Sequence, residues 1–509
     1  MNALFLVDQP WQLKLTESII REIQKLGLSI RPHIAIVDIF SFLHASEQIT
    51  RVSENLGISI YSLEEQYRNW QIGDPDFTKS DERYLKEWEA TYCTDRTLVE
   101  LERCNQWIFG FENNFFYKRT SLEWNKRFLL DSIKWCEEIL NKETFDVVFS
   151  IERATLPVNI FWTISQKRKT RFLTLFHSRI GQNWLIQENF GYGTSDAIKL
   201  KINSLEYTSK SNLVDSFLIT FDSKQIGSYE SFELRIDTSP FLTFSESISQ
   251  IWVAFRRLSG RVWTRLFHER KQVQIKIKRF EQNLLKLSFF DFKEVVYNLL
   301  IRLDILRIGE SPNYESTYFL WALHARPEGS VQALSKGQDE IEILKSVAAT
   351  LPKGVFLCVK ENTLMLGRRN IGFYHELSRS KNIRIVGISE NTYKLIQNSR
   401  GVLGLTGTVL LEAAILNKPA FTFGSPEFEE LIYSSKKMRF EDFISGALVN
   451  QLPAVKNSIY GYLYYCLKEG IEAPLYDYDE FSIGEALESV KQIANKIISE
   501  LYNSRVTRF

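Results

Sequence analysis

Short apolar runs alternate with longer amphipathic segments along most of the chain. After the first run, residues 11–27 repeat apolar positions at helical spacing and end at a glycine. Residues 81–140 also follow a helical pattern and are rich in Trp, Glu and Arg. The runs that predict strands in the first part of the chain are 2–7, 33–40, 145–152 and 171–181.

The same alternation returns after residue 316. The amphipathic segments there predict helices over 338–354, 373–382 and 391–401. The apolar runs predict strands, each with the loop that follows it, over 317–328, 355–362, 383–387, 402–408 and 420–427. Strands that alternate with helices pair in parallel, so both parts are expected to form doubly wound, Rossmann-like α/β domains.

The length of 509 residues is too great for one hydrophobic core, because cores stop growing at about 250–300 residues. We expect the first domain over 1–235, a basic helical connector over 236–312 and the second domain over 313–440. A helical tail over 441–509 is expected to pack back on the first domain. Two such domains would face each other across a cleft, with ligands bound outside the carboxyl ends of the strands.

The composition changes this picture little. Hydrophobic residues make up 44% and charged residues 25%, and the net charge of +1 argues against a nucleic-acid-binding protein. Five cysteines without a CxxC pair are typical of reduced thiols in the cytoplasm. The chain shows neither a signal peptide nor an apolar run long enough to span a membrane, so we expect a soluble, intracellular protein.

One stretch of the connector is strongly basic. Residues 251–280 hold nine Lys or Arg and one Glu, interleaved with aromatic residues. A solvated helical face explains this pattern, and so does contact with the anionic inner face of the cytoplasmic membrane, which would make the protein a peripheral membrane protein.

Polar residues follow the predicted strands of the second domain. These strand ends combine cations and hydroxyls with the start of a helix, whose free N–H groups and positive dipole end attract anions. Neither a Walker P-loop nor a GxGxxG fingerprint is present, which disfavours an ordinary ATPase or dehydrogenase. The candidate ligand-binding residues are His324, Arg326, Glu328, Lys360, Asn362, Arg368, Arg369, Thr406, Gly407 and Thr408.

Several of these residues also have structural explanations. Thr408 is well suited to cap the helix that follows it, and His324 could be a buried structural histidine. Glu412 is the one carboxylate in the apolar helix segment "VLLEAAIL", so it needs a partner there. A ribose hydroxyl pair would provide that partner, and we therefore include Glu412 in the candidate site.

Strand ends in the first domain carry a second group of candidates. Glu152 and His177 each follow a predicted strand and are candidates for a general base or an electrostatic stabiliser. Asp8, Gln12 and Arg179 are candidates for contact with a second substrate.

No metal site is expected. The pair Asp74 and Asp76 forms a DxD pattern, but no apolar strand precedes it, and a polar loop explains it. The six histidines are scattered without metal-ligand spacing. We predict no metal and no cofactor.

Taken in order, the motifs resemble those of bacterial capsule and surface polysaccharide biosynthesis proteins with the GT-B glycosyltransferase fold. The segments that carry the resemblance are "LHARPE" at 323–328, "VKENTLMLGRR" at 359–369 and "TGTVLLEAAILNKPAFTFG" at 406–424. The first domain matches weakly, through "DQPWQL" at 8–13, which is similar to bacterial sialyl- and polysialyltransferases, and "SRIG" at 178–181.

The resemblance implies a metal-independent GT-B glycosyltransferase. In the related capsule β-Kdo transferases a His-Pro pair and paired hydroxyls hold a CMP-sugar. Thr406 and Thr408 match the hydroxyls, whereas Asn362 and Thr363 replace the His-Pro pair. A CMP-sugar such as CMP-Kdo is favoured, and UDP- and GDP-sugars stay open.

The resemblance also implies how the two domains divide the work. The second would bind the nucleotide-sugar and the first a growing capsular or cell-surface polysaccharide or a glycolipid acceptor. Two alternatives stay open: a sugar-nucleotide epimerase or polyol-phosphate transferase on the same fold, and a non-catalytic scaffold in polysaccharide assembly or export.

Overall fold

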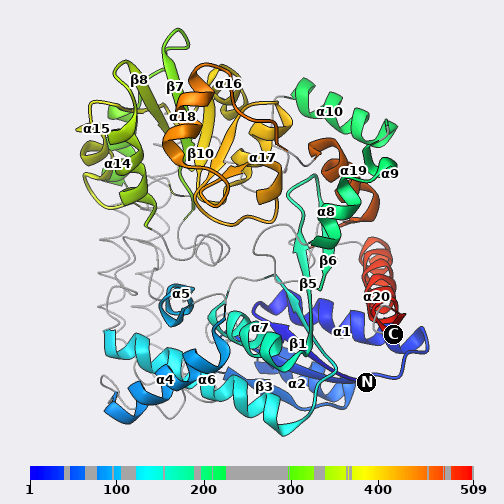
Figure 1. The fold of residues 1–509 in the computed structure, drawn as a ribbon. Helices are drawn as coiled ribbons and strands as arrows, with labels where there is room; N and C mark the ends of the chain where they lie inside the picture. The colour runs from blue at the N-terminus through cyan, green and yellow to red at the C-terminus, as the bar shows by residue number, and fades with distance from the viewer. Residues whose placement is uncertain are drawn as a thin grey trace, which may run out of the picture.

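The structure is a computed structural model, and it contains two β-sheets flanked by helices, one mostly and one entirely parallel (Figure 1). The residues that it describes are 1–38, 46–63, 77–94, 97–104, 122–152, 155–188, 196–208, 210–224, 296, 299–325, 339–362, 365, 369–455, 458–473, 475 and 483–506. The two doubly wound α/β domains predicted from the sequence, in a GT-B-like arrangement with helices at the C-terminal end, are confirmed.

The first sheet has the order β13-β6-β5-β4-β1-β2-β3. The five strands from β3 to β5 are parallel, and β6 and β13 are antiparallel to their neighbours. Its strands are β1 (Asn2–Val7), β2 (Arg31–Ile36), β3 (Ile60–Ser62), β4 (Val147–Ile151), β5 (Arg171–His177), β6 (Asn183–Gln187) and β13 (Ile471–Glu472).

The antiparallel strand β6 differs from the parallel pairing that we predicted. Only a short turn joins β5 to β6, and the Ser178 N–H donates to the Asn183 carbonyl at 2.9 Å to close it. Arg179 and Gly181 both have positive φ in this turn. A connection this short can only form a hairpin, because parallel strands need a long crossover.

Helices cover both faces of the first sheet. In β1, Leu4 and Leu6 pack into one hydrophobic cluster, whereas Phe5 and Val7 pack into another on the opposite face. This alternation is expected for a strand that is buried on both faces. The helices of this half are α1 (Pro10–Lys25), α2 (Ser46–Leu56), α4 (Lys79–Tyr92), α5 (Leu98–Arg103), α6 (Leu122–Lys142) and α7 (Leu156–Arg168).

The second sheet is parallel throughout and has the order β12-β11-β10-β7-β8-β9. Counted from β7, this is the strand order of a Rossmann sheet, with its switch point between β7 and β10. Its strands are β7 (Thr317–Ala322), β8 (Val355–Lys360), β9 (Ile383–Ile385), β10 (Gly401–Gly404), β11 (Ala420–Thr422) and β12 (Tyr433–Ser434). Its helices are α14 (Glu340–Thr350), α15 (Phe373–Ser378), α16 (Thr392–Asn398), α17 (Thr408–Ile415), α18 (Phe440–Leu448) and the 3-10 helix η5 (Glu429–Leu431).

A third group of helices joins the two halves. One hydrophobic cluster contains Phe176 and Ile180 from the first sheet's side together with Leu410 and Phe428 from the second. The helices α8 (Asp196–Ile202), α9 (Leu205–Thr208), α10 (Asn212–Lys224) and α19 (Ile459–Glu469) lie together beside this junction (Figure 1).

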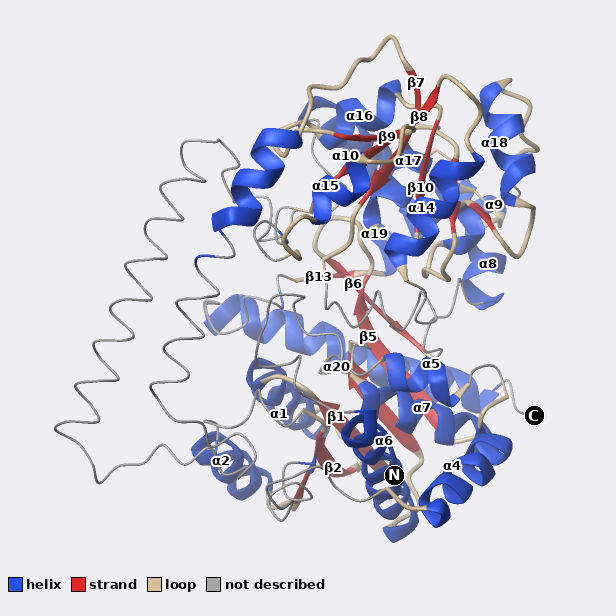
Figure 2. Ribbon diagram, turned by 90° about the vertical axis from the view of Figure 1, so that its left-hand side faces the viewer, coloured by secondary structure: helices blue, strands red, loops and turns tan. Residues whose placement is uncertain are grey.

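The C-terminal helix α20 (Ile483–Val506) packs against α1. The N-terminal residue and helix α20 therefore both lie in the half that holds the first sheet (Figure 2). The limits predicted for the four segments of the chain are not tested by these contacts and stay a prediction. None of the helices that the structure describes is long and apolar enough to cross a membrane.

Candidate functional site

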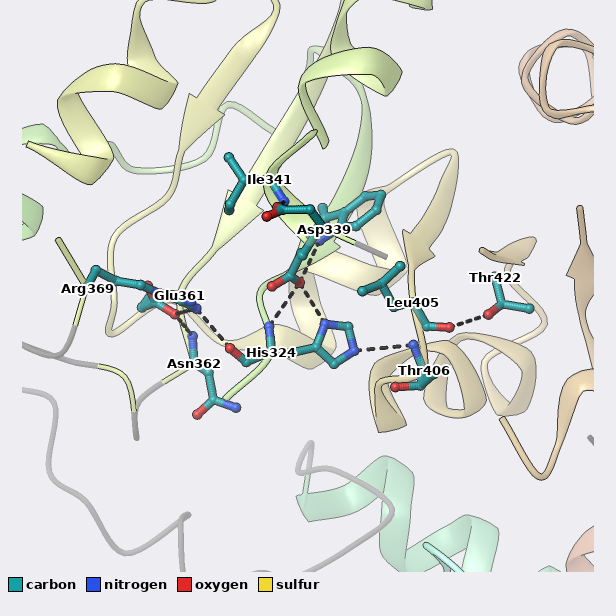
Figure 3. A network of polar contacts seen from close by, with 11 residues as sticks. His324, Asp339, Ile341, Glu361, Asn362, Arg369, Leu405, Thr406 and Thr422 are labelled. Carbon is teal, nitrogen blue, oxygen red and sulfur yellow. Dashed lines mark hydrogen bonds and ion pairs between the residues drawn. The ribbon is translucent and has the colours of Figure 1, made fainter. Parts of the chain in front are cut away.

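The switch point of the second sheet brings together two loops that are far apart in the sequence. His324 lies two residues beyond β7, and Thr406 lies two residues beyond β10. The Thr406 N–H donates to Nε2 of His324 at 3.3 Å (Figure 3). Two of the predicted site residues thus meet where open parallel sheets bind ligands.

The His324 ring is held from behind by Glu340, the first residue of α14. Nδ1 of the ring lies 2.6 Å from Oε1 of Glu340. The same oxygen accepts the His324 backbone N–H and the Trp321 indole N–H, each at 3.1 Å. Glu340 has no exposed surface, and these three contacts compensate for the burial of one of its two carboxylate oxygens, Oε1.

A second buried network follows β8. Arg369 makes two hydrogen bonds of 2.8 Å to the carboxylate of Glu361 and one of 2.9 Å to the His324 carbonyl (Figure 3). The Tyr374 hydroxyl and the Asn362 N–H also donate to Glu361, at 2.7 Å each. Arg369 is completely buried, so its guanidinium fixes the strand ends from inside the protein.

Lys360 ends strand β8 and is almost entirely buried. Its ammonium donates to the Ile388 carbonyl at 2.9 Å. Burial lowers the pKa of Lys360 from 10.5 to about 8. The predicted contact of Lys360 with a ligand stays a prediction.

Helix α17 begins directly in front of the His324 ring. Gly407 is its N-cap, with an extended backbone, and Thr408 is its first residue. The expectation that Thr408 caps the helix is wrong by one position, because Thr408 already has helical geometry. The first N–H groups of a helix have no partner within the helix, so this end can receive an anion. Glu412 lies one turn further along α17 and is nearly buried.

The switch point of the first sheet, between β1 and β4, holds carboxyl groups. Asp8 follows β1, and Glu152 follows β4 with a positive φ of 65°. Burial, and then the nearby carboxylates of Asp38 and Glu152, raise the pKa of Asp8 from 3.8 to about 8. Gln12 accepts the Asp8 N–H at 2.9 Å and donates to the Ile151 carbonyl at 3.4 Å, so it links the two strand ends.

His177 ends strand β5 and is buried. Its Nδ1 accepts the Arg179 N–H at 3.0 Å, and its ring packs edge-on against Trp184. Burial, with a smaller effect of the Arg179 charge, lowers the pKa of His177 to about 3. The neutral, enclosed ring does not favour the predicted role of His177 as a general base.

Arg179 points away from the first sheet towards the second. Its Nε lies 3.4 Å from Oε1 of Glu427, which follows β11. The carboxyl ends of the two sheets therefore face each other, and the two switch points lie on the facing sides. Contact of Arg179 with an acceptor stays a prediction.

Some predicted residues lie outside the described part of the chain. They are Arg326, Glu328 and Arg368, together with the Asp74–Asp76 pattern and the basic stretch 251–280. Within the described ranges, no three His, Cys, Asp or Glu side chains are grouped so that they could hold a metal ion. The predicted absence of a metal and of a cofactor is not tested.

Three carboxylates of these networks did not emerge from the sequence. Asp38 was assigned to the interior of a strand, whereas β2 ends at Ile36, so the strand-end rule would have found it. Glu340 and Glu361 carry weaker signals, because an acidic residue at the start of a helix or after a strand is usually exposed. Their burial depends on the sheet topology.

No protein-family model matches the chain, and no curated protein sequence matches it. It is similar in structure to the beta Kdo 2,7 transferase KpsC of Thermosulfurimonas dismutans, with 14% identity and a TM-score of 0.30, over 74% of this chain and 97% of that one.

Two further similar structures span nearly the whole chain. The UDP-GlcNAc 2-epimerase of Neisseria meningitidis, bound to UDP-GlcNAc, has 13% identity and a TM-score of 0.23, over 99% of this chain and 100% of that one. A glycosyltransferase of Rickettsia africae has 11% identity and a TM-score of 0.22, over 98% of both chains. With identities and TM-scores this low, these similarities assign no activity to the chain.

Proposed function

We propose that the chain is a GT-B glycosyltransferase. It moves a sugar from a nucleotide-activated donor to a growing capsular or surface polysaccharide or to a glycolipid acceptor. A CMP-sugar is the favoured donor, on the motif resemblance described above, and UDP- and GDP-sugars are the alternatives.

The observation that carries the proposal is the contrast between the two facing switch points. One presents the first N–H groups of α17 with the hydroxyls of Thr406 and Thr408, which suit an anionic phosphate. The other presents the carboxyl groups of Asp8 and Glu152, which suit a hydroxyl that must lose a proton. A donor on one side and an acceptor on the other is what sugar transfer requires.

In the donor half, the amides at the start of α17 would bind the phosphate that leaves with the nucleotide. They are fixed before the ligand arrives, so they stabilise the charge that develops on the leaving group. Glu412 would contact the ribose. Arg369 would act indirectly, because its buried guanidinium holds Glu361 and the His324 carbonyl in place.

In the acceptor half, we assign the general base to Asp8. With a pKa of about 8, the ionised form of Asp8 is a stronger base than an ordinary carboxylate, and this form predominates above about pH 8. As the acceptor oxygen bonds to the anomeric carbon, its proton passes to Asp8, and the bond from that carbon to the donor phosphate breaks. Glu152 would assist by keeping the pKa of Asp8 high.

The test is a thermal-shift panel with CMP, UDP, GDP and the corresponding sugar nucleotides. A ligand that binds only the folded state raises its stability, by about 2.7 kcal/mol at one hundred times its Kd. We expect one nucleotide class to stabilise the wild type and to lose this effect in the double variant Thr406→Val, Thr408→Val. The control, Thr350→Val at the exposed end of α14, should respond like the wild type.

Two outcomes would contradict the proposal. If none of the nucleotides stabilises the wild type, the chain is not a nucleotide-sugar enzyme and the scaffold alternative gains. Conversion of a nucleotide-sugar into its epimer, with no acceptor present, would instead favour the epimerase.

A further inference from the structure

The peptide unit between Leu405 and Thr406 is held at both ends. Its carbonyl, on Leu405, accepts the hydroxyl of Thr422 from strand β11. Its N–H, on Thr406, donates to Nε2 of His324 (Figure 3). Two side chains, one from strand β11 and one from the loop after β7, thus set the orientation of one peptide plane directly before α17.

This orientation matters for the residues that follow. Gly407 and Thr408 continue from the held peptide plane into the first turn of α17. A Cβ atom added at Gly407 would lie 3.1 Å from Nε2 of His324, so the chain passes close to the ring. If the ring moves, the direction of the first N–H groups of the helix changes with it.

Glu340 decides which nitrogen of the ring carries the proton. The Glu340 oxygen that faces Nδ1 already accepts two N–H groups, so it acts as an acceptor on that side of the ring, while the Thr406 N–H donates to Nε2 on the other side. Nδ1 is therefore the protonated nitrogen, which leaves a lone pair on Nε2 for the Thr406 N–H. With the proton on Nε2, two N–H groups would point at each other.

We propose that Glu340 is a positioning residue for the candidate nucleotide site, acting through the tautomer of His324 on the peptide 405–406. The identity of the ligand rests on the proposed function. The contacts that join Glu340, His324 and the peptide 405–406 are present without a ligand. Glu340 itself touches no substrate: it lies behind the ring and has no exposed surface.

A purely structural role for Glu340 predicts something different. It would stabilise α14 and strand β7 through the Trp321 and His324 bonds, and its loss would lower the melting temperature alone. The positioning role predicts in addition a changed His324 tautomer and a loosened Thr406 amide in protein that is still folded.

The first test is nitrogen NMR of the full chain labelled with 15N-histidine, which distinguishes the two imidazole tautomers. We expect the His324 ring, identified by its loss in His324→Gln, to carry its proton on Nδ1 in the free wild type. In Glu340→Gln both tautomers should be populated, because a neutral amide holds N–H donors less strongly than a carboxylate does. Glu342→Gln, an exposed change in the same helix, is the control and should leave the spectrum unchanged.

The second test measures the loop and the ligand. Hydrogen exchange of the peptide that contains Thr406 should quicken in Glu340→Gln, and the affinity for the nucleotide that binds the wild type, among CMP, UDP and GDP, should fall about tenfold, as the loss of one hydrogen bond predicts. Glu342→Gln should match the wild type in both.

A pair of His324 variants serves if Glu340→Gln does not fold. The side chain of Gln can place an acceptor near the position of Nε2, whereas that of Asn reaches only the position of Nδ1. His324→Gln should therefore keep slower exchange at Thr406 than His324→Asn.

The proposal is overturned if the wild-type ring carries its proton on Nε2, or if Glu340→Gln matches Glu342→Gln in exchange and affinity. If no nucleotide binds the wild type, the proposed function fails separately, and the tautomer and exchange data still decide whether Glu340 sets this peptide.

Discussion

The guanidinium of Arg179 pairs with the carboxylate of Glu427 at 3.4 Å and joins the carboxyl ends of two different sheets. Glu427 is buried, with 4% of its side chain exposed, and Arg179 keeps 24%. Arg179 also has a φ of 67°, in the left-handed region that non-glycine residues rarely occupy. Arg179 thus combines a side-chain contact to the other half with a strained backbone in the β5–β6 turn.

The first prediction separates the ion pair from the backbone strain at this position. Arg179→Gly and Arg179→Ala both lose the pair with Glu427, but only Ala keeps a Cβ in the left-handed region. Arg179→Gly should therefore be more stable than Arg179→Ala by about 1–2 kcal/mol. Urea unfolding of both variants measures this, and a ranking with Ala above Gly would contradict the assigned backbone conformation.

Substitutions at Arg179 also test whether its ion pair with Glu427 links the two halves of the molecule. In a double-mutant cycle, Arg179→Ala and Glu427→Gln should couple by about 0.5–3 kcal/mol, because the two side chains are in direct contact. The matched control is Glu429→Gln combined with Arg179→Ala, since Glu429 pairs with Lys436 instead. Coupling as large in the control as in the cycle would count against a specific contact.

The second prediction concerns Arg369, whose hydrogen bonds depend on its planar fork. Arg369→Lys keeps the charge but cannot bond both oxygens of Glu361 and the His324 carbonyl together. We expect a loss of about 1.5–3 kcal/mol, the range for a hydrogen bond to a charged group. Chemical unfolding measures it, and Arg384→Lys, on the exposed side of β9, should change stability by less than about 0.5 kcal/mol.

The sequence predicts the sheets well because their signal is local. The run "TYFLWA" is apolar at every position after its first residue, and it forms strand β7, whose four central residues are buried. The strand-end rule also brings His324 and Thr406 together correctly, although 82 residues separate them.

The supporting carboxylates could not be predicted in the same way. Glu340 is a partner of His324 because helix α14 begins beside the carboxyl end of β7. Nothing in its neighbours along the chain distinguishes it from the exposed Glu342. Conversely, Arg369 lies in the loop after a strand, where a phosphate-binding arginine would be expected, but it is fully buried and paired with Glu361.

The third prediction uses the closeness of Gly407 to His324. Gly407 has a φ of −65°, which alanine adopts without strain, so an effect of Gly407→Ala must be steric. Its Cβ would lie 3.1 Å from Nε2 and displace the ring or the loop, at a cost of about 1–3 kcal/mol. In Gly404→Ala the added atom would lie 3.8 Å from Leu410, an ordinary contact. Thermal unfolding should show a clear loss only for Gly407→Ala, and equal losses would count against the close approach.

The fourth prediction is the pH dependence that Asp8 gives to stability. Its pKa is about 8 in the folded protein and 3.8 ordinarily, so between these values the folded state binds a proton that the unfolded state lacks. The stability that Asp8 contributes to the folded state is therefore fully present below about pH 4, and it is lost as the pH rises to about 8. Asp8→Asn removes the titration and should therefore gain stability relative to the wild type over that range. Urea unfolding at several pH values measures the difference, and a difference independent of pH would contradict the raised pKa.

The same group should control the rate of sugar transfer. A base must be deprotonated to act, so kcat/KM should rise with pH and level off above about 8, and Asp8→Asn should lose a factor of about 100 or more. Because the Glu152 carboxylate helps to raise the pKa of Asp8, Glu152→Gln should stay active and shift the profile to lower pH. If instead Glu152→Gln abolishes transfer and Asp8→Asn only shifts the profile, the base is Glu152, and the roles of the two carboxylates are exchanged.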